Sequence, residues 1–344
     1  MKPLRVLVLM HEGLVPPASL EGYSDRQIEE FKAESDVMAC LEKAGHTVRA
    51  LGLGDNLGEL RAAIADWKPN VAFNLLEEFQ GIATYDQYVV AFLELMKQPY
   101  TGCNPRGLLI SRDKALSKQL LTYHRVPTPR FMVFRRGQRY RAPRKLAFPL
   151  FVKSVTDDAS FGISQASIVG DAERLKERVE FIHQQTGAHA LVEEYVEGRE
   201  LYVGVIGNDR LRTLPVWEMD FGTLPDVMAG IATRKVKWDR RYQQKHGIRT
   251  GPAQSLPDGC AAYLDKLSKR IYRALSLSGY ARLDFRMRND GSVFVLEANA
   301  NPNISHREDF ADSAEAGGVE YAALLEHILR LGRNYHAAWR IDEG

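Results

Sequence analysis

The chain has 344 residues, which is enough for two or three domains that each bury a core. Apolar residues make up 45% and charged residues 26%, values that are typical of globular proteins and exclude a disordered or fibrous chain. The 46 basic and 44 acidic residues leave a net charge of +2, so the surface as a whole offers no positive field for nucleic acid.

The first hundred residues alternate short apolar runs with amphipathic helical patterns. Strands are predicted at 4–10, 47–51 and 71–75, and helices at 24–44, 57–67 and 86–96. Strands that alternate with helices form a parallel sheet covered on both faces. The sequence therefore predicts an α/β, Rossmann-like first domain over residues 1–103.

After residue 103 the pattern changes to a smaller α+β unit. Two short helices are predicted at 104–123, strands at 131–134 and 148–152, and a helix at 171–185. Beyond residue 190 strands dominate, followed by a helix at 261–277, strands at 280–287 and 293–298, and a last helix at 319–331. We expect domain boundaries near residues 103 and 190, which gives a central lobe at 104–190 and a C-terminal lobe at 191–344.

The predicted hairpin of the last two strands carries the most chemical information. An Asn-Asp-Gly turn joins its strands. The two-residue period of a strand places Arg282 and Asp284 on one face, and by the same rule Glu297 and Asn299 share a face of the partner strand. Converging carboxylate and amide oxygens suit Mg²⁺, although ordinary cross-strand pairs on a solvent face would give the same pattern.

Other segments suit a nucleotide. Lys114 and Lys153 lie at a loop or strand end, where a lysine reaches either a phosphate or solvent. The loop Ser160-Phe161-Gly162-Ile163 has a backbone that can approach phosphate closely. From Glu193 to Glu200, carboxylates lie beside an apolar strand and a glycine turn, a pattern that fits an adenine- and ribose-binding linker or a solvated hinge.

Taken in order, these segments resemble the ATP-grasp superfamily, and most closely the D-alanine–D-alanine ligase family. The resemblance covers nearly the whole chain, including Phe73-Asn74-Leu75, Asp113-Lys114, Gly198-Arg199-Glu200 and Glu297-Ala298-Asn299. It implies an ATP-grasp fold, α/β and α+β, in which ATP lies between the antiparallel sheets of the central and C-terminal lobes. It also implies a carboxylate–amine ligase that forms an acyl phosphate, which an amine then attacks.

The resemblance implies roles for individual residues. Lys114 and Lys153 would contact the ATP phosphates under the loop from Ser160 to Ile163. The adenine-contacting hinge would consist of Glu193, Glu194, Tyr195 and Val196, and Glu200 would bind the ribose.

The same resemblance implies a metal and substrate site. Asp284, Glu297 and Asn299 would hold Mg²⁺, as two ions with Mn²⁺ as a substitute. Arg282 would steady the acyl phosphate and the later oxyanion, and Glu34, Lys237 and Asn303 would complete the substrate site. Glu34 would meet the donor's ammonium group; a charge on a helix surface is the alternative.

Several positions depart from the family pattern. The family's His-Gly after the third strand is replaced by Glu77 and its neighbours, and Ala159 and Trp238 stand where ligases of D-alanine carry hydroxyl side chains. Glu308 falls where a serine would bind the acceptor's carboxylate, and an acidic side chain would repel that group. We therefore expect an acceptor other than D-alanine, unless Glu308 points to solvent.

The remaining features indicate a cytoplasmic enzyme without nucleic-acid or membrane partners. Cys40, Cys103 and Cys260 lie far apart, which predicts reduced thiols, and no run of about 18 apolar residues or signal peptide occurs. The basic stretch from Arg234 to Arg249 lies where the family's lid loop lies, with a nucleic-acid surface as the alternative. The expected partners are a small carboxylate and an amine, amino acids in the family, and a second copy of the chain.

Two other functions stay open. A relative could join a different amino acid or a small metabolite carboxylate to an amine. A non-catalytic ATP-binding module is the alternative from a different class. Arg282 beside the metal ligands favours a catalyst, because a binding module has no oxyanion to stabilise.

Overall fold

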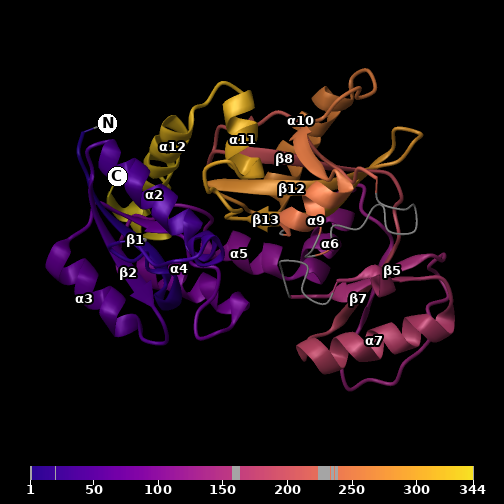
Figure 1. Ribbon diagram of the computed structural model, residues 1–344. Coiled ribbons are helices and arrows are strands. Elements are labelled where there is room, and N and C mark those ends of the chain that lie inside the picture. The colour runs from indigo at the N-terminus through magenta and orange to yellow at the C-terminus, as the bar shows by residue number, and fades with distance from the viewer. Residues whose placement is uncertain are drawn as a thin grey trace.

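The computed structural model describes residues 2–19, 21–156, 163–223, 233, 236 and 239–343. Figure 1 shows the chain coloured by residue number from indigo at the N-terminus to yellow at the C-terminus. No helix in these ranges has both the length and the hydropathy of a membrane span. The three cysteines are free thiols, as predicted.

A parallel sheet forms the centre of the first lobe, in the strand order β2-β1-β3. Leu7 and Leu9 of β1 pack on one face of this sheet against α3 and α4, and Val6 and Val8 pack on the other against α2 and α12. The elements are β1 (Arg5–His11), β2 (Thr47–Leu53), β3 (Val71–Asn74), α1 (Asp25–Glu30), α2 (Lys32–Lys43), α3 (Leu57–Trp67), α4 (Asp86–Leu95) and α12 (Tyr321–Arg333). The prediction of a parallel α/β unit is confirmed.

Two helices differ from the sequence prediction. The helix expected at 24–44 is interrupted at Phe31, whose backbone (φ −112°, ψ 22°) leaves the helical region between α1 and α2. The expected last helix is preceded by a separate one, α11 (Asp309–Ala316). Helix α12 lies beside α2 of the first lobe (Figure 1), with Leu324 and Ile328 in one cluster with Val37. We therefore propose that residues 321–333 belong to the first lobe.

The central lobe consists of an antiparallel sheet, in the order β4-β7-β5-β6, and helices on both sides of it. Helix α7 covers one face through Leu175, Val179 and Ile182. The elements are α5 (Pro105–Arg112), α6 (Lys114–Tyr123), β4 (Phe131–Phe134), β5 (Leu150–Ser154), β6 (Ile168–Val169), α7 (Ala172–Thr186) and β7 (Ala190–Glu194). Because β7 pairs with β4 and β5, we propose to move the boundary from residue 190 to the end of β7.

A side-chain cap positions helix α6. The Asp113 carboxylate accepts hydrogen bonds from the backbone N–H groups of Ala115 and Leu116, each at 2.9 Å. The helix thereby begins at Lys114, whose own N–H donates to the carbonyl of Val155 just after β5 at 3.0 Å. Both contacts hold α6, with its buried residues Lys114 and Lys118, beside the central sheet.

The C-terminal lobe is a second antiparallel sheet, in the order β11-β10-β8-β12-β13, with β9 paired to β8. Helix α10 covers one face, where Leu264 and Ile271 share a cluster with Leu283 and Phe285. The elements are β8 (Arg199–Ile206), β9 (Arg212–Thr213), β10 (Trp217–Asp220), α9 (Arg240–His246), β11 (Arg249–Pro252), α10 (Cys260–Ala274), β12 (Tyr280–Met287) and β13 (Val293–Ala300).

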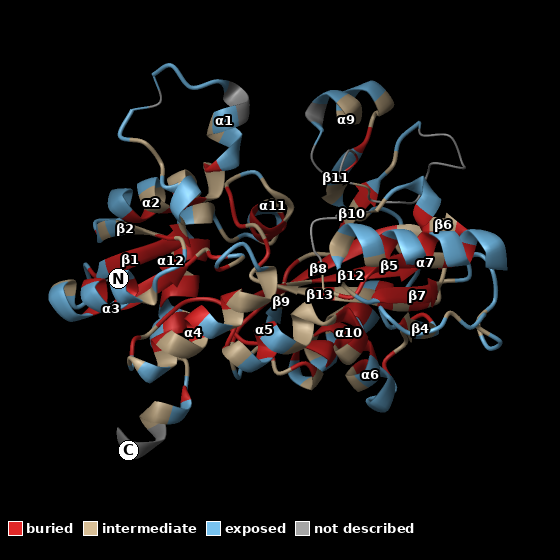
Figure 2. Ribbon diagram, turned by 90° about the horizontal axis from the view of Figure 1, so that it is seen from below, coloured by how far each residue is buried: buried red, intermediate tan, exposed pale blue. Residues whose placement is uncertain are grey.

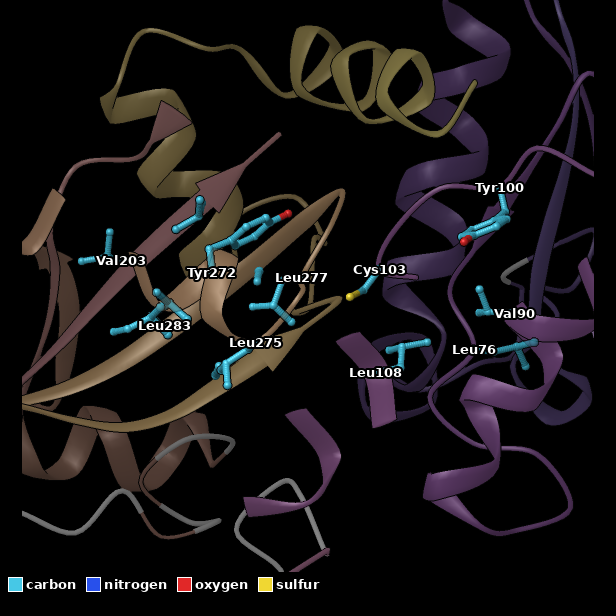
Figure 3. Packing of buried hydrophobic residues seen from close by; sticks show 14 of the residues in the cluster. Leu76, Val90, Tyr100, Cys103, Leu108, Val203, Tyr272, Leu275, Leu277 and Leu283 are labelled. Atoms are coloured by element: carbon cyan, nitrogen blue, oxygen red, sulfur yellow. The ribbon is translucent and has the colours of Figure 1, made fainter. Parts of the chain in front are cut away.

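A continuous hydrophobic cluster joins the first lobe to the last. Figure 3 shows Tyr100 of the first lobe and Leu108 of α5 on one side, Leu277 and Tyr272 on the other, and Cys103 between them. Cys103 has no exposed surface. In Figure 2 the buried residues follow the strands, while α3 and α7 each expose one side. The packed junction holds the first lobe in a fixed position against the sheet that carries Arg282.

Candidate active site

The predicted hairpin is present, and its register brings the polar side chains together. Strands β12 and β13 are antiparallel, with Arg282 opposite Asn299 and Asp284 opposite Glu297. Directly opposed residues of an antiparallel pair project from the same face. All four side chains therefore project from the face that α10 leaves open.

A β-bulge turns Glu297 toward Asp284. The register shifts between Asp284 and Phe285, which makes Leu296 the extra residue of β13. Val295, opposite Phe285, packs in the cluster under α10. With unbroken alternation Glu297 would share that buried face, because it lies two residues further along the strand. The sequence gives no clear signal for the bulge, because all four residues from 293 to 296 are apolar.

Arg282 and Asp284 form a two-pronged ion pair. Arg282 Nε lies 2.8 Å from Asp284 Oδ1, and Nη2 lies 3.0 Å from Oδ2. The guanidinium lies over the ring of Tyr202, 4.8 Å from its centre. Burial lowers the pKa of Arg282, but the Asp284 carboxylate outweighs burial and holds the pKa above its ordinary range. The guanidinium is a fixed positive charge at this end of the hairpin.

Asp284, Glu297 and Asn299 form a set of oxygen donors that fits Mg²⁺. The side-chain nitrogen of Asn299 is buried without a hydrogen-bond partner among the described residues, so its amide has unused bonding capacity. Within those residues no group of three or more His, Cys, Asp or Glu forms a metal cluster. Two carboxylates and one amide suit Mg²⁺, which completes its shell with water and phosphate oxygens.

A buried cluster of two lysines and one glutamate lies on the central sheet. Lys153 Nζ lies 3.0 Å from Glu193 Oε1, and Lys118 Nζ lies 2.8 Å from Glu193 Oε2. Carboxylates of the hairpin act on this cluster. Burial lowers the pKa of Lys153, but Glu193, together with Glu297 and Asp284 of the hairpin, outweighs burial and holds the pKa above its ordinary value. For Lys118 burial has the larger effect: it holds the pKa below its ordinary value, although the charges of Glu193 and Glu297 raise it.

Lys118 was not predicted as a site residue from the sequence. Its only signal is its spacing of four residues from Lys114, which places both lysines on one face of a helix. That face of α6 is buried, and Lys114 is buried as well. A buried helix face with two lysines indicates that carboxylates or a ligand must compensate their charge.

The hinge that follows β7 is held by backbone and side-chain contacts. The N–H of Tyr195 donates to the carbonyl of Pro149 at 3.0 Å, and Glu194 Oε1 accepts from the N–H of Ala147 at 3.0 Å. Val196 is buried. Of the predicted hinge residues, Glu193 and Glu194 therefore end strand β7, and Tyr195 and Val196 begin the connection to β8.

Glu200 already has hydrogen-bond donors at both carboxylate oxygens. Tyr202 Oη donates to Oε1 at 2.7 Å, and Arg286 Nη2 donates to Oε2 at 2.6 Å. Arg286 also donates to the carbonyl of Gly198 at 2.8 Å. A ribose at Glu200 would therefore share these oxygens, and Arg286, to which the sequence analysis assigned no role, positions the carboxylate.

Glu34 lies in the first turn of α2 and is only 4% exposed, which excludes a charge on the helix surface. Burial, helped by the negative charge of Glu77 and opposed by a backbone hydrogen bond, raises the pKa of Glu34 from 4.5 to about 7. Near neutral pH this carboxyl group therefore changes between its neutral and ionised forms.

This raised pKa predicts a pH-dependent stability. Between pH 4.5 and about 7 the folded chain keeps a proton on Glu34 that the unfolded chain releases, so stability is greatest at low pH and falls as the pH rises. Wild type should lose about 3 kcal/mol more than Glu34→Gln over this interval. Urea denaturation of both proteins across this pH interval measures the difference. An equal pH dependence of the two proteins would contradict the raised pKa of Glu34.

The turn after β13 is hydrogen-bonded to the first lobe. Asn303 Oδ1 accepts from the N–H and Oγ of Ser305 at 2.8 and 2.6 Å, which fixes the turn. The N–H of His306 donates to Asp36 of α2 at 2.9 Å. Glu308 is half-buried at the start of α11. The predicted substrate residues Glu34 and Asn303 therefore belong to two segments that contact each other.

Six residues named from the sequence lie outside the described residues: Ala159, Ser160, Phe161, Gly162, Lys237 and Trp238. Ile163 is described and half-buried.

Several known proteins are similar to most of this chain. Residues 120–330 match the family model described as D-ala D-ala ligase C-terminus. The D-alanine–D-alanine ligase of Nitratidesulfovibrio vulgaris (strain DP4) is 30% identical over 247 residues, which cover 72% of this chain and 76% of that protein. The enzyme of that name from Desulforudis audaxviator is 27% identical over 315 residues, 91% of this chain and 96% of the relative. An uncharacterized protein of Sinorhizobium fredii, y4sG, is 34% identical over 259 residues, 75% of this chain and 73% of the relative.

Solved structures share the fold. The D-alanine–D-alanine ligase of Bacillus anthracis, in a crystal structure with ATP, superposes with a TM-score of 0.73 at 23% identity, covering 99% of this chain and 100% of that one. The ligase of Coxiella burnetii gives a TM-score of 0.72 at 16% identity, and the match covers 100% of this chain and 97% of that one.

The fold and the family match define the class of this protein as an ATP-grasp ligase that forms carbon–nitrogen bonds with the use of ATP. The chain belongs to the D-alanine–D-alanine ligase family. The predicted fold and the prediction of a carboxylate–amine ligase are confirmed, and a non-catalytic module is not favoured.

Proposed function

We propose that this ligase activates an amino acid carboxylate with ATP and Mg²⁺ and joins it to an amine other than D-alanine. One observation carries the proposal: the buried cations of the central sheet face the carboxylates and guanidinium of the hairpin. Cations on one side and metal-binding oxygens on the other suit a polyphosphate between the sheets.

ATP binding is the first task of the site. Lys114 and Lys153 would contact the phosphates, and the loop from Ser160 to Ile163 would close over them. The hinge from Glu193 to Val196 would bind adenine, with Glu200 at the ribose. Support comes from the burial of both lysines and the ordered hinge. Lys237 would add a cation from the lid.

Asp284, Glu297 and Asn299 would hold Mg²⁺, with Mn²⁺ as a substitute. The ion would neutralise charge on the transferring phosphoryl group. The position of Asn299 on the same hairpin face as both carboxylates supports this role, since a metal site would use its amide oxygen.

The reaction has two steps in which Arg282 stabilises charge. A carboxylate oxygen of the donor attacks the γ-phosphorus, the bond to ADP breaks, and an acyl phosphate forms. The amine nitrogen then attacks the acyl carbon, the carbon–oxygen bond to phosphate breaks, and the amine loses a proton. Arg282 uses two of its five N–H donors on Asp284. Its remaining donors are available to the oxyanion of the second step.

The substrates are bound between the first lobe and the turn after β13. An ionised Glu34 would bind the donor's ammonium group, and Asn303 would shape the acceptor side. Negative charge at Glu77 and Glu308 disfavours a substrate carboxylate near either position. We infer that the acceptor lacks a carboxylate where D-alanine carries one.

Glu308 provides a direct test of the acceptor. Glu308→Ser should lower the KM for D-alanine as acceptor by about tenfold, because it removes a partly buried like charge. Initial rates of ADP release against D-alanine concentration measure the change. Asp258→Ser, an exposed acidic residue before α10, is the control. If wild type saturates with D-alanine at millimolar concentration and forms D-alanyl-D-alanine, the proposed acceptor is wrong.

The ligase function itself is tested by ADP release with D- and L-amino acids, singly and in pairs. The proposal predicts release that depends on two components together. Release that no pair stimulates would contradict amino acids as substrates and favour a small metabolite carboxylate.

We propose a homodimer as the assembly. Leu95 and Tyr88 of α4 are 82% and 55% exposed, which supports a contact surface on the first lobe. The molar mass from light scattering tests this, and a monomer at micromolar concentration would contradict it.

A further inference from the structure

Lys118 is almost completely buried, at 1% exposed, yet it lies outside the phosphate-binding set described above. It forms an ion pair with Glu193 Oε2 at 2.8 Å and donates a hydrogen bond to Thr128 Oγ1 at 2.9 Å. The other oxygen of Glu193 forms an ion pair with Lys153 at 3.0 Å. One carboxylate thus bridges two lysines, and only Lys153 is assigned to ATP.

The charges of this cluster explain why a second lysine is needed. Glu193 and Lys153 alone would cancel, and a neutral pair attracts a phosphate weakly. With Lys118 present, the cluster carries one net positive charge. Because the three side chains are buried, water screens this charge poorly.

A further contact ties Lys118 to the opposite sheet. Thr128 Oγ1 donates to the carbonyl of Val295 on β13 at 3.2 Å, and the N–H of Val295 donates to the carbonyl of Pro127 at 2.9 Å. The Lys118 ammonium is therefore fixed between the central sheet and the strand that carries Glu297. A fixed ammonium holds Glu193 in place without moving toward the phosphate itself.

We propose that Lys118 is a positioning residue for ATP: it neutralises Glu193, so that the positive charge of Lys153 remains available to the nucleotide phosphates. The inference rests on the proposed phosphate contact of Lys153. It separates the two lysines by role, since Lys153 touches the nucleotide and Lys118 acts through Glu193.

The test compares dissociation constants of ATP and adenosine, because adenosine lacks the phosphates. Lys118→Met should weaken ATP binding by about tenfold and adenosine binding by less than about twofold. The double variant Lys118→Met/Glu193→Gln restores the net charge and should recover most of the ATP affinity. Glu193→Gln alone keeps both lysines and should raise the ratio of ATP to adenosine affinity, which tests the proposal even if Lys118→Met fails to fold.

Two further variants separate the possible failures. Lys269→Met removes a lysine that pairs with Asp265 on the surface of α10 and should change neither constant. If Lys153→Met leaves ATP affinity unchanged, the phosphate contact of Lys153 is wrong, and the inference falls with it. If Lys153→Met weakens ATP binding but Lys118→Met does not, only the inference is wrong. Equal weakening of ATP and adenosine by Lys118→Met, without recovery in the double variant, would show a purely structural role.

Discussion

Replacing Arg282 by alanine should lower kcat by about 10²–10³-fold while ATP still binds, as expected when one donor to a developing oxyanion is removed. The guanidinium is fixed on Asp284 and Tyr202 before any substrate arrives, so it needs no rearrangement to stabilise charge. Steady-state rates of ADP release at saturating Mg²⁺, together with ATP binding by calorimetry, measure both properties.

The control for this variant is Arg212→Ala. Arg212 is exposed and donates one hydrogen bond to the carbonyl of Gly317. Its loss should leave kcat unchanged. Because Arg282→Ala also leaves Asp284 without its counter-charge, thermal unfolding must show that the variant is folded at the assay temperature. A folded variant with wild-type kcat would remove Arg282 from the mechanism.

Replacing Glu297 by glutamine should raise the Mg²⁺ concentration needed for half-maximal activity by at least about tenfold. Loss of a group that only supports a metal ligand already lowers metal affinity by about that factor. The change keeps the shape of the side chain and removes one of two carboxylates. Activity measured against Mg²⁺ concentration, and again with Mn²⁺, gives the shift.

Glu180→Gln is the matched control for this experiment. Glu180 lies on α7, is exposed, and is 3.9 Å from Lys176 in a surface pair. It should leave the metal dependence unchanged. A Glu297→Gln protein with wild-type dependence on Mg²⁺ would show that the hairpin does not hold the ion.

The hairpin illustrates what the sequence could predict. The Asn-Asp-Gly turn and the two-residue period predicted the hairpin, with Arg282 and Asp284 on one face of its first strand. Unbroken pairing from the turn would set Asp284 opposite Leu296, whereas the structure has it opposite Glu297. The bulge at Leu296 was not predicted, because residues 293–296 are all apolar and show no change of face. Strict alternation describes each strand separately, and only the pairing of the two strands shows where an extra residue fits.

Long-range contacts account for the other differences. An amphipathic pattern predicts that α12 buries one face, but not that the face packs on α2 of the first lobe. Glu34 was assigned to the substrate site from the family resemblance, with a surface charge as the alternative, and Lys118 was assigned no role. Their burial depends on residues far along the chain, such as Glu77 beside Glu34 and Glu193 beside Lys118.

The central claim is that ATP activates a carboxylate as an acyl phosphate, and transfer of oxygen-18 tests it most directly. The donor amino acid is labelled in its carboxylate, and the released phosphate is analysed by mass spectrometry. The mechanism predicts one labelled oxygen in each phosphate, because the carboxylate oxygen that attacks phosphorus leaves with it. Product formation with unlabelled phosphate would contradict the mechanism.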